Sequence, residues 1–317
     1  MDRRFPQNDH PEAQDEPAHG RISLATEPLP PPGSPITRRS FLRIAAAASA
    51  AFALYMGEFA RHELQTNHVT VPIRNLPEAF HGFRIVQISD LHLEEYTEEF
   101  FLRHVVHHVN SLSADMVLVT GDYISHSPRG RAFALRTAVT CAEILHDLTC
   151  PLRFGCMGNH DAVVGSRQVA ERIRPSGVIP LINQYVPIER NGDRLWLGAI
   201  DDPAKGAPIL ETSLPKQIDA PVLYMAHEPD YADFLATQPA GQHISLILAG
   251  HSHGGQIRLP FLPPPVLPPG AERYYEGTYH VGPMQLYVNR GIGTVGVPMR
   301  LNCPPEVTVL TLQPANA

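Results

Sequence analysis

The stretch RIVQISDLH, residues 84–92, decides the fold of this chain. Its first five residues form a short run rich in β-branched side chains, and a polar cluster with Asp90 and His92 follows at once. An apolar run of this length is typical of a buried strand in a sheet that is covered on both faces. Because α/β folds place their functional sites at the carboxyl ends of such strands, Asp90 and His92 are candidate site residues.

The same arrangement, an apolar run that ends in polar residues, recurs four times further along the chain. The four segments are MVLVTGD at 116–122, LRFGCMGNHD at 152–161, VLYMAH at 222–227 and ISLILAGHSH at 244–253. A helical pattern precedes the first of them. Thr97 is a suitable N-cap for that helix, and Phe101, Val105 and Val109 recur every four residues after it.

Later apolar runs at 195–200, 285–288 and 307–312 predict a second sheet packed on the first. We therefore expect an α/β fold of four layers, an α/β/β/α sandwich that forms one catalytic domain over residues 65–317. The composition of the 317 residues, 43% hydrophobic and 18% charged, suits such a domain. A formal net charge of −7 predicts no basic face, so nucleic acid is not an expected partner.

The polar ends of the five strands share carboxylate, imidazole and amide groups, which are metal-binding side chains. In chain order they are Asp90, His92, Asp122, Asn159, His160, His227, His251 and His253. This mixed set suits Mn²⁺, Fe²⁺ or Zn²⁺ better than Ca²⁺ or Mg²⁺. Two neighbouring cations repel each other, and Asp122, which stands alone after Gly121, is suited to bridge them. No cysteine lies in these clusters, so a structural zinc site is not expected.

The spacing within two of the clusters carries a further expectation. In Asp90-x-His92 and His251-x-His253, alternate side chains would lie on one side of an extended chain. Such a pair either binds one metal or divides between two. A single Asp-x-His is more often surface polarity than a ligand pair, but five such clusters after apolar runs favour one site. His104, His107 and His108 lack acidic partners at ligand spacing, and we interpret them as surface or packing residues.

The order Asp-x-His, Gly-Asp, Gly-Asn-His-Asp, His and Gly-His-x-His resembles the calcineurin-like metallophosphoesterase superfamily over residues 83–256. The motifs ISDLH, GHSHGGQ and RGIGT resemble those of a narrower bacterial group of proteins. With that group the resemblance extends from about Thr70 to Leu312. Members of that group are exported or membrane-associated phosphoesterases. Some carry twin-arginine signals, and some are related to enzymes that cleave UDP-2,3-diacylglucosamine.

The resemblance implies a role for each site residue. Two divalent metal ions, with manganese favoured, would be bound by the following sets: Asp90, His92 and His253 for the first, and Asn159, His227 and His251 for the second, with Asp122 bridging. His160 would act on the phosphoryl group without being a ligand. Purple acid phosphatases have a Tyr three residues after the bridging Asp, where this chain has Ser125, so an Fe(III)–tyrosinate centre is not expected.

These roles predict a phosphomono- or phosphodiesterase in which a hydroxide shared by the two metals attacks phosphorus in line. A hydrolase of lipid-linked pyrophosphates of the UDP-diacylglucosamine type is the alternative. A binding protein without catalytic activity is an alternative of another class. It would be expected to lack ligands of the superfamily pattern, and none is missing here.

The N-terminal part of the chain has the layout of a targeting signal. Residues 1–36 are rich in Pro, Asp, Glu and Gln, which predicts disorder. In residues 37–64, TRRSFLR is followed by an apolar run from Ile44 to Gly57, which resembles a twin-arginine export signal. A buried helix with a basic start is the alternative. We expect export to the periplasm by the twin-arginine machinery.

The fate of that segment stays open at this point. The apolar run is about 14 residues long, short of the roughly 20 that span a bilayer. The sequence therefore does not distinguish cleavage of the signal from its retention as a membrane anchor.

Three other features have two readings each. The proline-rich stretch 260–269 is either a rigid surface connection or an apolar lip for a membrane or an acyl chain, formed by Phe261, Leu262, Val266 and Leu267. Arg290 and Arg300 either contact the substrate phosphate or are ordinary surface cations. Cys141, Cys150, Cys156 and Cys303 are core or surface thiols, with a Cys141–Cys150 disulfide as the alternative.

Overall fold

The computed structural model describes residues 36–94, 96–126 and 128–315. The chain divides into two compact units, Met1–Ala47 and Ala48–Ala317. The stretch 1–36, for which the sequence predicts disorder, lies outside the described residues except for Ile36. The expected boundaries at 37–64 and 65–317 stay predictions.

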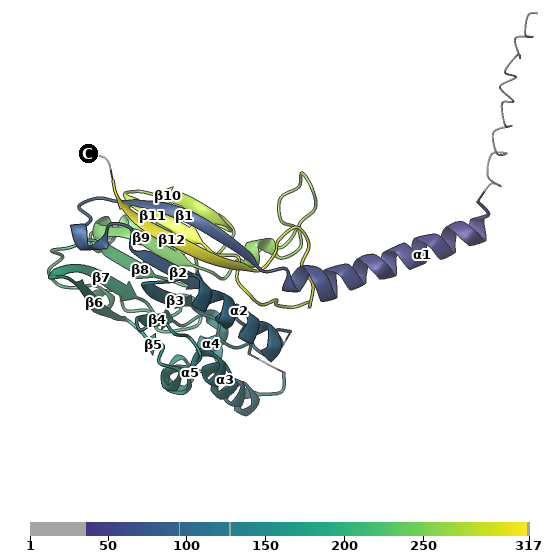
Figure 1. Cartoon of the computed structure of the whole chain (residues 1–317), viewed down its shortest axis with the longest axis horizontal. Coiled ribbons are helices and arrows are strands. Elements are labelled where there is room, and N and C mark those ends of the chain that lie inside the picture. The colour runs from purple at the N-terminus through teal and green to yellow at the C-terminus, as the bar shows by residue number, and fades with distance from the viewer. Residues whose placement is uncertain (1–35, 95, 127, 316–317) are drawn as a thin grey trace, which may run out of the picture. The chain divides into compact units, whose positions relative to one another are not determined.

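Two six-stranded sheets form the larger unit (Figure 1). The first has the order β1 (Gln65–Ile73), β12 (Glu306–Pro314), β2 (Arg84–Ile88), β3 (Met116–Thr120), β4 (Arg153–Cys156) and β5 (Ile179–Pro180). The second has the order β10 (Gly277–Val281), β11 (Met284–Val288), β9 (Ile244–Ala249), β8 (Val222–Met225), β7 (Asp193–Ala199) and β6 (Gln184–Arg190).

Strands β2 to β5 run parallel in the first sheet, and β7, β8, β9 and β11 run parallel in the second. Parallel strands end at the same edge of their sheet. The polar residues that follow β2, β3 and β4 therefore meet at one edge, as do those that follow β8 and β9.

The alternation along β8 shows how the layers form. Leu223 and Met225 belong to a buried cluster that also contains Ile85 and Leu118, so this cluster fills the space between the two sheets. Tyr224 belongs to a separate cluster on the outer face of the second sheet. A strand that is apolar on both faces is what a sheet covered on both sides requires.

Helices cover the outer faces. The first sheet is covered by α2 (Glu99–Ser111), α3 (Arg131–Leu145) and α5 (Ser166–Ile173), and the second by α6 (Leu210–Ser213) and α7 (Tyr231–Thr237). Shorter turns are η3 (Glu78–Phe80), α4 (Asn159–Val164), η4 (Arg174–Ser176), η5 (Ala240–His243) and η6 (His253–Gly255). The prediction of an α/β/β/α sandwich is confirmed. The expectation that the run 307–312 belongs to the second sheet is wrong, because β12 pairs with β1 and β2 in the first sheet.

Helix α2 begins one residue later than its expected cap suggests. Its N-cap is Glu98, so the expectation that Thr97 caps the helix is wrong. The apolar stripe is as expected, since Phe101, Val105 and Val109 are buried. His104 and His107 are exposed, and His108 Nε2 lies 2.6 Å from Thr66 Oγ1, in agreement with surface and packing roles.

The apolar N-terminal segment is helical for longer than its sequence run suggests. α1 (Arg38–Leu54) continues through the π-helix η1 (Tyr55–Phe59) and the 3₁₀ turn η2 (Ala60–His62). The whole run of 25 residues is long and apolar enough to cross a membrane, by length and composition. A signal sequence near the N-terminus meets the same criteria. No residue of α1 is buried, which is against the alternative of a buried helix.

All four cysteines are free and buried. The Cys141–Cys150 disulfide alternative is therefore wrong, and so is the surface reading of these thiols. Burial in the core raises the pKa of the Cys141 thiol far above its ordinary value, so it behaves as an apolar packing residue.

Candidate metal centre

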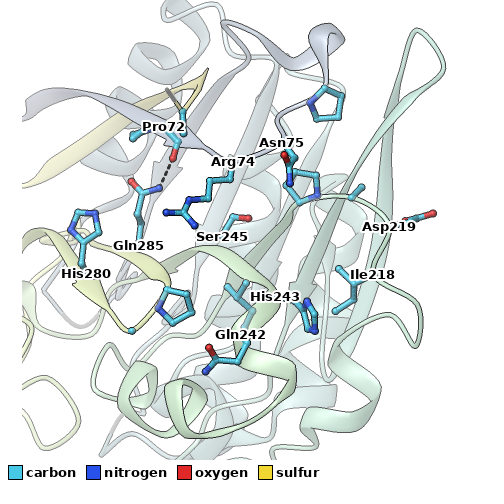
Figure 2. Close-up of a pocket in the computed structure, with 17 residues that line it drawn as sticks. Pro72, Arg74, Asn75, Ile218, Asp219, Gln242, His243, Ser245, His280 and Gln285 are labelled. Atoms are coloured by element: carbon cyan, nitrogen blue, oxygen red, sulfur yellow. Dashed lines mark hydrogen bonds between the residues drawn. The ribbon is translucent and has the colours of Figure 1, made fainter. Parts of the chain in front are cut away.

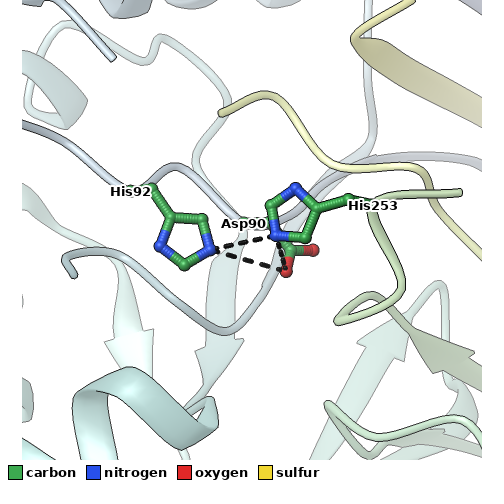
Figure 3. A group of neighbouring side chains, drawn as sticks. All are labelled: Asp90, His92 and His253. Carbon is green, nitrogen blue, oxygen red and sulfur yellow. Dashed lines mark hydrogen bonds and ion pairs between the residues drawn. The ribbon is translucent and has the colours of Figure 1, made fainter. Parts of the chain in front are cut away.

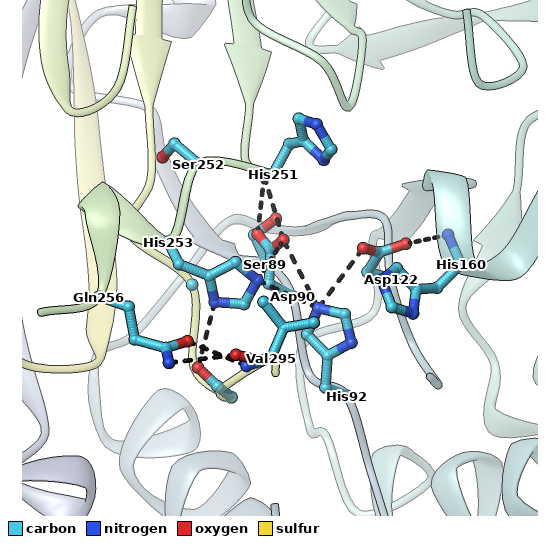
Figure 4. A network of polar contacts seen from close by, with 12 residues as sticks. Ser89, Asp90, His92, Asp122, His160, His251, Ser252, His253, Gln256 and Val295 are labelled. Carbon is cyan, nitrogen blue, oxygen red and sulfur yellow. Dashed lines mark hydrogen bonds and ion pairs between the residues drawn. The ribbon is translucent and has the colours of Figure 1, made fainter. Parts of the chain in front are cut away.

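The eight candidate residues converge where the carboxyl ends of the two sheets meet. Figure 4 labels Asp90, His92, Asp122, His160, His251 and His253 among them. The first sheet contributes Asp90 and His92 after β2, Asp122 after β3, and Asn159 and His160 after β4. The second contributes His227 after β8, and His251 and His253 after β9. All of them except Asn159 are buried, so polar groups are concentrated here in a site shielded from water.

Carboxylates and imidazoles within this centre form three overlapping groups, each with its potential ligand atoms within 4.8 Å of one another. They are Asp90, His92 and His253 (Figure 3); Asp122, His227 and His251; and His92, Asp122 and His160. Asp90 and His92 thus share one group. His251 and His253 divide between two groups, the second of the two arrangements that the spacing allowed.

Asp122 lies between the first two groups. Its Oδ2 atom is 3.4 Å from His92 Nε2 and 3.2 Å from His227 Nε2. On the other side, Asp90 Oδ1 is 3.4 Å from His253 Nε2. A carboxylate in this central position can face two cations at once.

The backbone at these residues is not extended, so the expectation from alternate side chains is wrong. The φ angle is 53° at Asp90, 43° at His92, 68° at His251 and 48° at His253. Asp122 has φ of 53° as well. Left-handed backbone at a non-glycine residue costs of order 1–3 kcal/mol and persists only where the surroundings hold it. These turns, rather than an extended chain, direct the side chains into the centre.

Two glycines make room for the carboxylates. A Cβ atom on Gly158 would lie 2.2 Å from Asp122 Oδ1, and one on Gly250 would lie 2.3 Å from Asp90 Oδ2. The glycines that precede Asn159 and His251 therefore allow the backbone to approach the carboxylates closely. The backbone N–H of His251 donates to Asp90 Oδ1 at 3.0 Å, and that of His160 donates to Asp122 Oδ1 at 2.9 Å.

Each histidine among the proposed ligands has one ring nitrogen engaged by the protein. His92 Nδ1 is 2.9 Å from Ser125 Oγ, and His227 Nδ1 is 2.7 Å from the Thr120 carbonyl oxygen. His253 Nδ1 is 3.3 Å from a carbonyl oxygen in the loop after β11, and His251 Nε2 is 2.9 Å from the carbonyl oxygen of Pro269. Such contacts fix the ring and leave its second nitrogen for a metal.

Two buried polar atoms in the centre have no hydrogen-bond partner. They are His227 Nε2 and Asn159 Oδ1. His227 Nε2 is close to Asp122 Oδ2, but the pair does not have hydrogen-bond geometry. Buried acceptors without partners are rare in native proteins, and nitrogen and amide oxygen are both metal ligands. The donor set therefore fits two divalent cations.

The charges of the centre are mixed. Burial disfavours the charged form of His227, but Asp122 and Asp90 outweigh it and raise the His227 pKa well above its ordinary value, so this ring holds a proton that a metal would displace. Burial lowers the pKa of His253 to about 4 and that of His92 well below its ordinary value, so both rings are neutral, the form that binds metals. Burial opposes ionisation of Asp122, but the neighbouring His227, His160 and His92 outweigh it and lower the Asp122 pKa. The central carboxylate is therefore an anion.

Sequence reasoning missed two residues beside His160. The backbone N–H of His126 donates to His160 Nδ1 at 3.1 Å, and the two Nδ1 atoms are 3.0 Å apart. Asp161 accepts hydrogen bonds from the N–H groups of Tyr123 and Gly158 at 3.1 and 3.0 Å. Asp161 is part of the quoted motif and could have been singled out. Nothing in the sequence signals the contact with His126.

Tyr123 lies in the core rather than in the metal centre. It belongs to the cluster between the first sheet and its helices, and a Cβ on Gly155 would lie 1.9 Å from its hydroxyl. No tyrosine lines the cavity of the centre within the described part of the chain.

Both readings of Arg290 and Arg300 are wrong. Arg300 is fully buried and donates to the carbonyl oxygens of Arg290, Gly291, Gly293 and Cys303. Arg290 is 9% exposed and pairs with the buried Glu306, with Nε 2.6 Å from Oε2. The two arginines shape the loop after β11, whose Gly293 N–H donates to the Asp90 carbonyl oxygen at 2.7 Å. Through this loop they help to fix the backbone of Asp90.

A cavity of about 440 Å³ opens beside the centre. Asp122, Asn159, His160, His251 and His253 line its polar side. The rest of its lining is largely apolar and includes Ile257, Pro265, Val266, Pro268, Val295 and Val297. Of the four residues of the proposed apolar lip, Phe261, Leu262 and Val266 are exposed and Leu267 is half-buried.

A larger cavity, of about 650 Å³, contains none of the candidate ligands (Figure 2). It lies at the amino-terminal ends of β8, β9 and β11, where Pro221, Ser245 and Gln285 line it. Arg74 and His243 also face this hollow.

A family model described as calcineurin-like phosphoesterase matches residues 83–255, which contain all eight candidate residues. This chain belongs to the calcineurin-like phosphoesterase family. It is therefore a phosphoester hydrolase of a family that uses divalent metals, and the recognition of the superfamily from its motifs is confirmed.

Relatives of this phosphoesterase have several names. YkuE of Bacillus subtilis (strain 168), an uncharacterized metallophosphoesterase, is 34% identical over 89% of this chain and 99% of that protein. Phosphodiesterase YaeI of Escherichia coli (strain K12) is 31% identical over 73% of this chain and 82% of that protein. The UDP-2,3-diacylglucosamine pyrophosphatase LpxG of Chlamydia muridarum is 29% identical over 74% of this chain and 86% of that protein.

Proposed function

We propose that this phosphoesterase hydrolyses phosphomono- or phosphodiester bonds with two divalent metal ions. The ions would be bound by Asp90, His92 and His253, and by Asn159, His227 and His251, with Asp122 between them. Manganese is the favoured metal, since the mixed nitrogen and oxygen donors suit it. The observation that carries the proposal is the pair of carboxylate–imidazole groups that meet at Asp122.

When bound, the metals would supply an activated water and neutralise charge that develops on the phosphoryl oxygens. His160 has a separate task. Because the His126 backbone N–H donates to His160 Nδ1, the N–H group that the His160 ring can offer is the one at Nε2. That N–H can donate to the leaving oxygen of a phosphoester in the cavity, which His160 lines.

A lipid-linked pyrophosphate is the second candidate substrate. Two observations favour it: the apolar wall of the cavity, and the name of the relative from Chlamydia muridarum. An acyl chain would lie along Ile257, Val266 and Val297 while the phosphate faces the centre. A binding protein without activity would explain the buried ligand set less well, since unpartnered acceptors and left-handed backbone at five ligands are costly to keep without a catalytic site.

The test is purification of the full chain with Mn²⁺, followed by parallel assays. The substrates are p-nitrophenyl phosphate, bis-p-nitrophenyl phosphate and UDP-diacylglucosamine. We expect hydrolysis of at least one, abolished by a chelator and restored by Mn²⁺. A chain that holds two metals per molecule and hydrolyses none of the three would overturn the proposal and favour the binding protein.

We also propose that the N-terminal segment directs export and is retained as an anchor. Replacement of Arg38 and Arg39 by Lys should leave the chain in the cytoplasm, because the paired arginines are the feature read by the twin-arginine machinery. Cell fractionation and immunoblotting provide the measurement. Arg43→Lys, the same change one turn later in α1, is the control and should be exported normally.

A further inference from the structure

The loop Leu259–Val266 exposes apolar side chains at the rim of the metal cavity. Phe261 is fully exposed, at 105%, and Val266 is 75% exposed. Leu259, Leu262 and, from a separate loop, Val297 are exposed as well. Single exposed apolar residues are common, but several of them beside a functional cavity indicate a contact surface.

The loop has a restricted backbone with fixed flanking residues, and Phe261, Leu262 and Val266 stay exposed on it. Four of its eight residues are proline, which restricts the backbone. Phe261 has a φ of 66°, a conformation that a bulky residue rarely adopts. Just before the loop, Arg258 pairs with Glu276 and donates to the Gly254 carbonyl oxygen. Just after it, Pro269 accepts from the ligand His251.

The end of the N-terminal helical run is attached at the same rim. The Arg300 N–H donates to the Met56 carbonyl oxygen at 3.2 Å, and the Pro298 carbonyl oxygen lies beside Gly57. Arg61 pairs with Glu98 and donates to the Tyr96 carbonyl oxygen. Pro298 directly follows Val297, which lines the metal cavity together with Val266.

These contacts have a consequence for a chain whose helical run stays in a membrane. A flexible tether would let the domain point in any direction. Here the last residues of the run are bound to the loop that borders the cavity, and Phe52, Tyr55 and Phe59 in the run are exposed. A bilayer that takes up these side chains lies next to the rim that carries Phe261 and Val266.

We propose that the loop Leu259–Val266, together with Val297, docks onto the lipid bilayer that holds the helical run. The metal cavity then opens toward the headgroup layer, where a phosphoester on a lipid can enter it. This inference rests on the proposed function for the retained helix and for hydrolysis in the cavity. It adds a second membrane contact, made by the catalytic domain itself.

The test uses the full chain in vesicles of phosphatidylethanolamine and phosphatidylglycerol. Trp196 is the only tryptophan, so Trp196→Phe gives a silent background in which Phe261→Trp reports on the loop. Acyl-chain-brominated lipids quench tryptophan only where it enters the bilayer. We expect emission from position 261 to fall about two-fold or more, as for an aromatic residue at the interface.

The matched control is Phe234→Trp in the same background, because Phe234 is an exposed phenylalanine of α7 outside the rim. Equal quenching at positions 261 and 234 would overturn the docking. Emission at 261 that follows protein concentration instead of brominated lipid would also overturn it, since a second copy would then cover the loop.

Hydrolysis of the soluble p-nitrophenyl esters by the same preparations separates the two proposals. An active chain without quenching at position 261 means that docking fails and the phosphoesterase proposal stands. Quenching in a chain that is loaded with metal but inactive means that docking stands and the proposed reaction fails.

Discussion

The second sheet has a cavity at each end, and the two cavities differ in volume and in the candidate ligands that line them. The cavity at the amino-terminal ends of β8, β9 and β11 is the larger, about 650 Å³ against about 440 Å³. Only the smaller one, at the carboxyl ends, contains candidate ligands. None of the three carboxylate–imidazole groups found in the described residues includes a residue that lines the larger cavity. Volume alone would have pointed to the wrong end of the sheet.

The backbone explains the difference. At the carboxyl ends, left-handed residues such as Asp90 and His251 turn their side chains inward, and the two sheets supply both groups. At the amino-terminal ends, Asp219 accepts a hydrogen bond from Trp196 Nε1 at 2.8 Å, and Arg74 and His243 are exposed. Open polar hollows bind water, whereas convergent buried donors bind cations.

The largest effect expected is that of Asp122→Asn. Loss of the central anion should lower kcat by about 10³-fold or more and release metal, since its charge is shared by both groups. Hydrolysis of p-nitrophenyl phosphate and metal analysis of the purified variant provide the measurements. Asp219→Asn, the same change at the larger cavity, should alter neither. Equal losses of kcat and bound metal in both variants would contradict the distinction between the two cavities.

The second-largest effect is expected for His160→Ala. Without a proton donor for the leaving oxygen, kcat should fall by about 10²–10⁴-fold while bound metal is unchanged. The test combines steady-state kinetics with metal content. His243→Ala at the larger cavity is the control and should behave as the parent. If His160→Ala loses its metals, His160 is a ligand and the assigned role is wrong.

Ser125→Ala should have a smaller effect that sharpens the comparison. The change removes the partner of His92 Nδ1 and leaves the ring free to rotate, so Mn²⁺ affinity should drop about 10–100-fold. Activity measured against Mn²⁺ concentration should recover at saturating metal. Ser245→Ala at the larger cavity serves as the matched control. Unchanged Mn²⁺ affinity in Ser125→Ala would mean that this hydrogen bond does not orient His92.

The smallest effect is expected for Arg74→Ala. The side chain is exposed and faces a cavity without candidate ligands, so kcat and KM should change by less than about two-fold. Kinetics with all three substrates provide the check. A KM increase of ten-fold or more would assign substrate binding to the amino-terminal end and contradict the distinction drawn between the cavities.

Much of the fold was predictable because its determinants are local. Residues 84–92, 116–122 and 244–253 each combine an apolar run with a polar end, and such patterns depend on neighbours in the sequence. They predicted buried strands and the strand ends at which candidate residues gather, whereas the four layers were predicted from these and the later apolar runs together. The roles of the individual ligands stay a proposal that the variants above test.

Other expectations failed because they depended on distant segments. Whether Arg300 is a surface cation or a buried donor is decided by carbonyl oxygens presented by the loop that follows β11. The contact of His126 with His160 needs the ends of β3 and β4 side by side. Neither arrangement leaves a pattern in the residues themselves.

The sequence by itself determined the strands, the order of the polar clusters and the chemistry of their side chains, because these follow from residue type and spacing. Only the tertiary structure decided that Asp90, His92, Asp122, His251 and His253 adopt left-handed backbone, and that His251 and His253 divide between two groups. The physical reason is that a strained turn is stable only when packing from both sheets holds it, and that packing exists only in the folded chain.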